Sequence, residues 1–424
     1  MAKQDMAKSR IVNGMPQGAD FKKRMAARKQ RGLIWSILFQ ASMILGIVAL
    51  SALLYNVINQ SFGYVAIENS VEPETLAING TPLEELSKEQ LIPILEAHVS
   101  KGLMRRLEKD QPFAERSRDN VYELILERVI EPQTEASWSL VDSLLHRAEI
   151  MQEAQTDYPN AHLEFRSWLN ASFVKNQQSS TPDLAGVRTA IFGSLWTILI
   201  TLLFALPVGV GAAVYLEEYA ADNMLNRLIK TNIDNLAGVP SIIYGMLGLA
   251  IFVRALEPLT SGALFGVVDD TTANGRTILS AGLTLGLLVL PLIIINAQEA
   301  IRAVPSSLRE AGYGLGATKW QVIWSHVLGS ALPGILTGNI LAMSRAIGET
   351  APLVVVGASA FVALDPNGPF SKFTTLPVQI YQWTARPQDQ FRNIAAAAIL
   401  VLLILLLTLN ASAVLLRNRY SQKL

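Results

Sequence analysis

Apolar residues gather into six long runs that are separated by polar stretches. A helix that crosses the hydrocarbon core of a bilayer needs ~20 predominantly apolar residues, and each run is long enough. The pattern therefore predicts an all-α integral membrane protein with six transmembrane helices. The predicted helices cover residues 33–55, 189–216, 235–253, 277–298, 327–358 and 393–416.

Prolines interrupt three of these runs, at Pro207, Pro240 and Pro291. Inside a membrane, proline is tolerated where neighbouring groups satisfy the freed backbone, and it can kink the helix. Glycine and alanine are frequent in the same runs, and small residues let helices approach one another closely. We therefore expect bent, closely packed helices around a pathway.

The polar stretch between the first two runs, residues 56–188, is long enough to form a small domain. It has 21 acidic and 12 basic residues, a net charge of 12 − 21 = −9. Thr81 as cap and Pro82 at the first position predict a helix start. Apolar residues at helical spacing predict a mainly helical insert whose stripes form its own core. The stripes are Leu83, Leu86, Ile94 and Leu95, then Trp138, Val141, Leu145, Ala148 and Met151.

Charge predicts the orientation. Residues 1–31 carry nine basic and two acidic residues, a net charge of 9 − 2 = +7, and are expected to form a mobile tail at the membrane surface. Only Phe21 accompanies these charges as an aromatic residue, so we expect no nucleic-acid binding. Basic flanks stay in the cytoplasm, which places the N-terminus and, after six spans, residues 417–424 there. The insert then lies outside, and residues 32–55 form an uncleaved first span.

The composition excludes several kinds of chemistry. The chain has no cysteine, so it forms no disulfide, thiolate nucleophile or cysteine metal site. Its four histidines are scattered without metal-ligand spacing, and no Gly-rich loop ends in Gly-Lys-Ser or Gly-Lys-Thr. We therefore expect no metal, no cofactor and no enzyme activity in this chain.

A polar stretch near residues 305–325 separates the fourth and fifth runs. Pro305 opens it, and Ser306 is expected to cap a short helix. Small residues follow, which predicts a surface that another protein approaches closely. The alternative is an ordinary loop between two membrane helices. The candidate docking residues are Glu310, Ala311, Gly312 and Gly316.

Two charged residues, Arg345 and Glu349, lie inside the fifth run, with Ser344 and Thr350 beside them. Four residues apart, the charges share one helix face and can pair. An ionised side chain at this depth costs ~3 kcal/mol on insertion scales, so both must face protein or water. An arginine fork matches an oxyanion such as phosphate, which Glu349 would release by neutralising Arg345. The alternative is a purely structural ion pair.

The docking stretch resembles the EAA loop of permeases from bacterial ATP-binding-cassette importers. That pattern is E-A-A, three residues, G, nine residues, then I-x-L-P, and Glu310, Ala311, Gly316 and Leu328 match it. Gly312 replaces the third small residue, while His326 and Gly329 depart from the pattern.

Four further segments resemble PstA-type permeases of phosphate-specific importers, within the binding-protein-dependent transport permease family. With the EAA loop they cover the chain from about residue 189 to its end. The long insert after the first span resembles an extended subgroup and is assigned no role. The segments are residues 207–220, 238–245, 345–352 and 376–387.

The resemblance implies a type I importer fold, with residues 189–416 as permease core and residues 305–325 as cytoplasmic coupling loop. It implies a multi-pass protein of the bacterial inner membrane that forms half of a phosphate pathway. The implied partners are a PstC-type permease, two copies of an ATPase that carries the ATP and Mg²⁺, an extracytoplasmic phosphate-binding protein and membrane lipid.

Two alternatives remain. One is a permease for another oxyanion, sulfate or molybdate. The other is a membrane sensor that uses the insert to bind a ligand, although none of the short cytoplasmic segments looks like a kinase or a cyclase.

Overall fold

The computed structural model describes residues 11–12, 15–16, 19–78, 80–110, 112–267, 274–358, 362 and 365–421. The chain divides into two compact units, Met1–Val57 and Ile58–Leu424. Much of the predicted basic tail, including Lys3, Lys8 and Arg10, lies outside the described residues, as does Lys423 near the other end.

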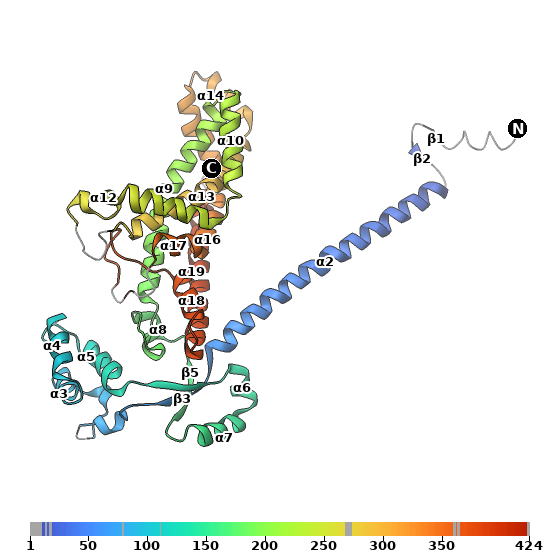
Figure 1. Cartoon of the computed structure of the whole chain (residues 1–424). Helices are drawn as coiled ribbons and strands as arrows, with labels where there is room; N and C mark the ends of the chain where they lie inside the picture. The colour runs from blue at the N-terminus through green and yellow to red at the C-terminus, as the bar shows by residue number, and fades with distance from the viewer. Residues whose placement is uncertain are drawn as a thin grey trace. The chain divides into compact units, whose positions relative to one another are not determined.

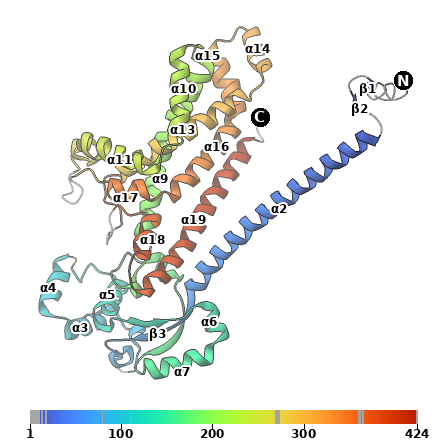
Figure 2. The same ribbon diagram turned by 45° about the vertical axis from the view of Figure 1, so that its right-hand side comes forward.

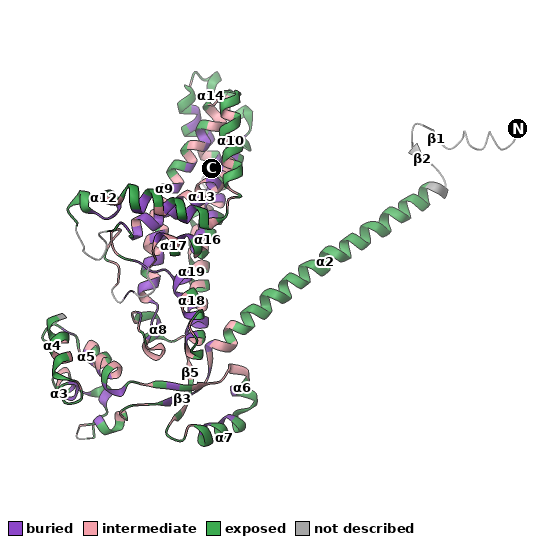
Figure 3. Cartoon of the chain, in the orientation of Figure 1, coloured by how far each residue is buried: buried purple, intermediate pink, exposed green. Residues whose placement is uncertain are grey.

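The first unit consists of two short strands and most of one long helix. Strand β1 (Ile11–Val12) pairs with β2 (Met15–Pro16). Helix α2 (Ala19–Ser61) contains the first predicted span, and its side chains are exposed throughout residues 21–56 (Figure 3). Residues 19–31, expected in the tail, are helical, because alanine, methionine, lysine and arginine, all good helix formers, extend the helix toward the N-terminus.

Four long helices form the bundle of the second unit (Figures 1 and 2). They are α9 (Arg188–Val214), α13 (Ile278–Arg302), α16 (Leu328–Gly348) and α19 (Asp389–Ser421). Helix α13 packs against both α9 and α16, as expected for a helix that is apolar on all sides. A Cβ at Gly286 of α13 would lie 2.5 Å from Cδ1 of Phe204 in α9, so the small residue is what permits this contact.

The third predicted span is bent. Helix α10 (Met224–Leu236) is followed by α11 (Ser241–Gly248) and the π-helical turn η6 (Leu249–Ala255), with an angle of 107° at the break. Pro240 lacks an N–H and disfavours a helical residue before it, so the helix restarts at Ser241. Among the described residues, five helices are long and apolar enough to cross a membrane, or six if this bent pair is one span.

The fifth predicted span is also broken. Helix α16 ends at Gly348, Glu349 has an extended backbone (φ −76°, ψ 122°), and α17 covers Ala351–Val356. A proline clashes with the carbonyl four residues earlier, and Pro352 is four residues after Gly348, which disfavours a continuous helix across this segment. By contrast, Pro207 and Pro291 lie inside α9 and α13, which are each assigned as one helix.

A three-stranded antiparallel sheet that the sequence did not predict organises the insert. Its central strand, β3 (Phe62–Glu68), pairs with β4 (Gln133–Ser137) and β5 (His162–Ser167), and the register places Val65 opposite Ser137 and Glu164. Helices still make up most of the regular structure. They are α3 (Lys88–His98), α4 (Lys101–Asp110), α5 (Arg118–Ile125), α6 (Leu140–Leu145), α7 (Arg147–Asp157) and α8 (Ala171–Lys175).

Three predictions within the insert need correction or refinement. The predicted helix start at Thr81 is wrong, because α3 begins after Ser87, which forms a capping box with Gln90. All four members of the first apolar stripe are nevertheless in the insert core, on α3 and before it. The second stripe is not core, since Leu145 is 73% exposed and the buried residues of α7 are Ile150 and Ala154.

Short helices and helical turns make up the remaining described elements. They are η1 (Pro73–Leu76), η2 (Leu83–Glu85), η3 (Leu126–Ile130), η4 (Pro182–Leu184), η5 (Tyr215–Tyr219), α12 (Glu257–Thr260), η7 (Ala263–Phe265), α14 (Ser306–Gly314), α15 (Lys319–Val322), η8 (Ile323–Val327) and α18 (Leu376–Thr384).

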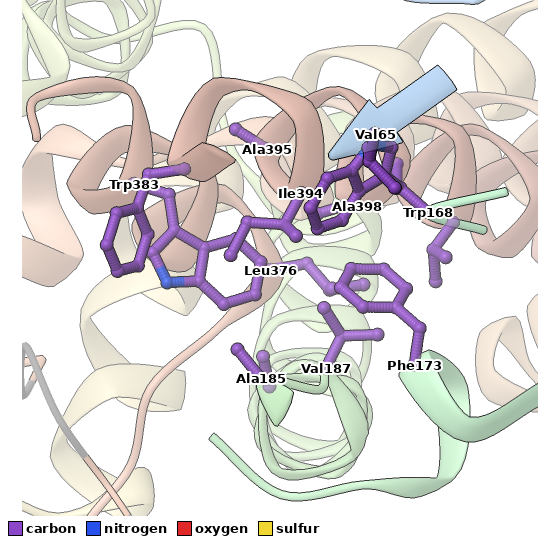
Figure 4. Packing of buried hydrophobic residues seen from close by; sticks show 14 of the residues in the cluster. Val65, Trp168, Phe173, Ala185, Val187, Leu376, Trp383, Ile394, Ala395 and Ala398 are labelled. Atoms are coloured by element: carbon purple, nitrogen blue, oxygen red, sulfur yellow. The ribbon is translucent and has the colours of Figure 1, made fainter. Parts of the chain in front are cut away.

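An apolar cluster joins the insert to the bundle (Figure 4). Trp168 and Phe173 of the insert pack with Trp383 of α18 and Ile394 of α19, and each is at most 4% exposed. The ring centroids of Phe173 and Trp383 are 6.1 Å apart. Burial of such large side chains fixes the insert at one end of the bundle.

Candidate functional site

Helix α14 and the turn after it form the docking segment, at the end of the bundle opposite the insert (Figure 1). Pro305 occupies the cap position with an extended backbone, so Ser306 is the first helical residue and not the cap that the sequence predicted. Gly316 has φ +80°, a left-handed conformation that glycine adopts without steric cost, and it turns the chain into α15. Thr318 caps α15 and exchanges hydrogen bonds with Gln321.

The four predicted docking residues face in two directions. Glu310, Ala311 and Gly316 are exposed, and Leu315 beside them is 89% exposed. Gly312 is buried instead, and a Cβ there would lie 2.8 Å from Cγ2 of Val322. Glu310, Ala311 and Gly316 are therefore accessible to a partner, whereas Gly312 packs inside this chain.

The break between α16 and α17 holds the predicted charged pair. Arg345 Nε lies 3.3 Å from Glu349 Oε1, and their side chains are 46% and 18% exposed. Glu349 lies outside the helix, so the pairing rests on the bent backbone and not on a shared helix face. Ser344 is directed elsewhere: its hydroxyl lies 2.8 Å from the Ile340 carbonyl oxygen and 2.8 Å from Asn410 Oδ1 of α19.

Thr350 directly precedes α17, and no hydrogen bond of its side chain to the helix start is seen. The structure therefore brings Arg345, Glu349 and Thr350 to one backbone break and assigns Ser344 to a contact between helices. Because Arg345 is half exposed on a membrane helix, the cost of placing a charge in lipid requires that water or another protein covers it.

Residues that were given no role from the sequence hold the docking segment in place. Arg309, next to Glu310, binds Glu218, which lies just beyond α9. The only sequence signal for this contact is an acidic pair, Glu217 and Glu218, directly after a long uncharged run.

The insert contains a cavity of about 700 Å³ with charged groups of both signs. Arg166 and Asp183, two of its lining residues, form an ion pair, and Thr134 Oγ1 donates to the same carboxylate at 2.5 Å. Burial raises the pKa of Tyr122 and of Glu123 in the same wall. Across the described part of the chain, no group of three or more His, Cys, Asp or Glu residues is placed to hold a metal ion.

The fold is a bundle of helices long and apolar enough to cross a membrane, with the exposed helix α14 at one end. Residues 205–423 match the family described as binding-protein-dependent transport system inner membrane component. This match covers half of the chain, and the chain belongs to that family. The family resemblance and the multi-pass membrane fold inferred from the sequence are thereby confirmed.

Named relatives match about half of the chain. A probable ABC transporter permease protein, YqgI, of Bacillus subtilis (strain 168) is 34% identical over 218 residues, which cover 51% of this chain and 68% of the relative. The phosphate transport system permease protein PstA 1 of Mycobacterium tuberculosis (strain ATCC 25618 / H37Rv) is 36% identical over 234 residues, covering 55% and 70%. The phosphate transport system permease protein PstC of Xylella fastidiosa (strain 9a5c) is 36% identical over 205 residues, covering 46% and 62%.

Solved structures resemble the chain more distantly. The inward-facing MetNI methionine ABC transporter aligns with a TM-score of 0.40 and 16% identity, over 55% of this chain and 94% of that chain.

Proposed function

We propose that this chain is a permease subunit that forms half of the membrane pathway for ATP-driven import of inorganic phosphate. The observation that carries the proposal is the pairing of two features in one bundle: an exposed docking helix, α14, and a half-exposed arginine, Arg345, at a helix break. Family membership supports the transport role, and relatives named as phosphate permeases support the substrate.

The proposed orientation places α14 in the cytoplasm and the insert outside. The basic start of α2 and the end of α19, with Arg417 and Arg419, carry the positive charge that marks the cytoplasmic side. In this orientation the insert, with its excess of acidic residues, is extracytoplasmic, and both chain ends are cytoplasmic.

In the proposed pathway, Arg345 attracts the oxyanion. Its planar guanidinium presents several N–H donors, and Glu349 approaches only its Nε, at 3.3 Å. A phosphate that binds the remaining N–H donors weakens the interaction between Arg345 and Glu349. When the phosphate leaves, Glu349 pairs with the guanidinium again. Because Glu349 lies on extended backbone between two helices, a small change at the break alters its distance from Arg345. The hydroxyl of Thr350 is a further donor beside it.

The energy for transport comes from ATP hydrolysis by another subunit. ATP and Mg²⁺ are assigned to a separate ATPase, present in two copies, of which one docks on Glu310, Ala311 and the turn at Gly316. A PstC-type permease supplies the other half of the pathway, and an extracytoplasmic phosphate-binding protein delivers the substrate. The present chain contributes binding and conformational change and no covalent chemistry or cofactor.

Uptake of labelled phosphate by cells that carry the partner subunits tests the pathway residue. We expect Arg345→Ala to reduce uptake to background, with assembly of the complex confirmed by co-purification. Arg392→Ala is the matched control, because Arg392 forms an exposed ion pair with Asp389 and is expected to leave uptake unchanged. Unimpaired uptake by Arg345→Ala would remove this residue from the pathway, and uptake of sulfate or molybdate in place of phosphate would reassign the substrate.

A further inference from the structure

A partly buried ion pair connects the docking helix to the end of α9. The π-helical turn η5 follows α9 and carries Glu218, whose Oε1 accepts from Arg309 Nη2 at 2.8 Å and from Nε at 3.1 Å. The Glu218 side chain is 8% exposed and that of Arg309 is 20% exposed. Burial of this kind limits the solvent screening that weakens surface ion pairs.

The same guanidinium also binds the end of α13. Arg309 Nη1 donates to the carbonyl oxygen of Val304 at 2.7 Å, and Nη2 donates to that of Ile301 at 3.0 Å. One rigid, planar group on α14 thus joins the ends of two bundle helices. Arg309 precedes Glu310 in the helix, so the residue that faces inward is adjacent to the one that faces a docking partner.

The neighbouring carboxylate reinforces this arrangement. Glu217 pairs with Arg302 in the last turn of α13 and lies 3.6 Å from Lys230 Nζ of α10. Lys319 of α15 lies over the ring of Tyr219, 4.9 Å from its centroid. Three residues of η5, Glu217, Glu218 and Tyr219, therefore contact charged side chains of α10, α13, α14 and α15.

Other contacts of α14 are with the segment that follows it. Of its nine residues, all of them described, only Gly312 is buried, and Gly312 packs on Val322 of α15. Val322 belongs to a buried apolar cluster that also contains Val214 of α9 and Ile301 of α13. Beside this indirect apolar contact, Arg309 provides the direct hydrogen-bonded connection between α14 and the ends of α9 and α13.

We propose that the Arg309–Glu218 pair is the link through which a displacement of α14 by the docked ATPase moves α9, and that Arg309 and Glu218 are positioning residues for coupling. The inference rests on the proposed function. A link that only supported folding would change the amount of complex, whereas a link that transmits motion changes the phosphate transported for each ATP hydrolysed.

The complete complex in proteoliposomes tests the link. We expect Glu218→Gln and Arg309→Gln each to lower the ratio of phosphate transported to ATP hydrolysed by about tenfold, within the range found for residues that carry coupling between sites. Arg309→Lys, which keeps a positive charge and N–H donors beside Glu218, is expected to recover much of the ratio. Asp222→Asn is the matched control, since its pair with Arg227 is largely exposed. An unchanged ratio in Glu218→Gln would overturn the proposal, whatever the yield of complex.

A second measurement does not depend on the substrate. Because the chain has no cysteine, Leu315→Cys beside α14 and Leu203→Cys in α9 give two unique spin-label sites in this chain, and both residues are exposed. We expect one narrow distance distribution with and without ATP on the ATPase, and a broad one after Glu218→Gln. Identical distributions with and without Glu218→Gln would refute the link, while absence of phosphate transport by the unaltered complex would refute only the proposed substrate.

Discussion

The insert and α14 are attached to the same bundle by different interactions. The insert contributes Val65, Trp168 and Phe173 to a cluster of buried apolar side chains, whereas α14 contributes a guanidinium, that of Arg309. Apolar burial is strong and non-directional, so it holds a domain in place without defining one axis of movement. A multiply hydrogen-bonded ion pair is directional and suits an element that must transfer a displacement.

Hydrogen bonds add a second difference. At the insert end, Asn393 Nδ2 of α19 donates to Ser137 Oγ of β4 at 2.9 Å, and Gln390 Nε2 of α19 donates to the carbonyl oxygen of Thr134 in the same strand. These bonds supplement an apolar contact that is already large. At the α14 end the bonds of Arg309 are the direct attachment, and the apolar contact is an indirect one through Gly312 and Val322 of α15.

The largest stability effect is expected from Trp168→Ala at the insert end. Trp168 is 4% exposed, and removal of a buried aromatic side chain costs about 3–5 kcal/mol of unfolding free energy. Thermal unfolding of the purified complex measures the loss. Leu145→Ala is the control, since that side chain is 73% exposed and its loss should leave the midpoint within error. Equal midpoints for the two variants would contradict apolar attachment of the insert.

Asp183→Asn is expected to have the next largest effect. The Asp183 side chain is 2% exposed and accepts from Arg166 and Thr134, and removal of one charge leaves Arg166 without its partner. A loss of about 3 kcal/mol follows for a buried pair. Chemical unfolding followed by tryptophan fluorescence measures it. Asp119→Asn is a suitable comparison because that carboxylate is 82% exposed, and a similar loss in both variants would argue against a special role for Asp183.

Gly312→Ala tests packing at the docking segment. The added methyl group meets Val322, and overpacking of this kind costs about 1–3 kcal/mol. Hydrogen exchange should become faster in α14 and stay unchanged in the insert. Addition of Val322→Ala should restore slow exchange, and a failure to restore it would place the strain elsewhere.

The smallest effect is expected to be stabilising. Gln379 of α18 is 1% exposed, and within the described structure neither atom of its amide group has a hydrogen-bond partner. Replacement by methionine, which has a similar shape, removes a buried unsatisfied group, and we expect a gain of about 1 kcal/mol. A lower unfolding temperature for Gln379→Met would show that the amide makes a favourable contact.

Sequence patterns predict the straight helices well and the breaks poorly. Helices α9, α13 and α19 follow from long, uncharged apolar runs, since a helix in lipid or in a bundle is apolar on most sides. The sequence shows Pro240, but whether a proline breaks the helix depends on whether neighbouring groups satisfy the freed backbone groups. The helix breaks at Pro240 and continues through Pro207. Strand β4 reads Gln-Thr-Glu-Ala-Ser, and its polar residues give no strand signal.

In the candidate site, too, some residues can be predicted from the sequence and others cannot. Glu310 and Gly316 lie in a local motif, so a sequence is sufficient to select them. The inward role of Gly312 and the direction of Ser344 depend on neighbours in space. Arg309 and Glu218 are 91 residues apart, and no spacing rule connects them.

ATP-driven accumulation of labelled phosphate in proteoliposomes tests the central claim most directly. The complex would contain the ATPase, the partner permease and the binding protein, with or without this chain, and an excess of sulfate. We predict accumulation that requires this chain and is unaffected by sulfate. An assembled complex that hydrolyses ATP and accumulates no phosphate would contradict the assignment.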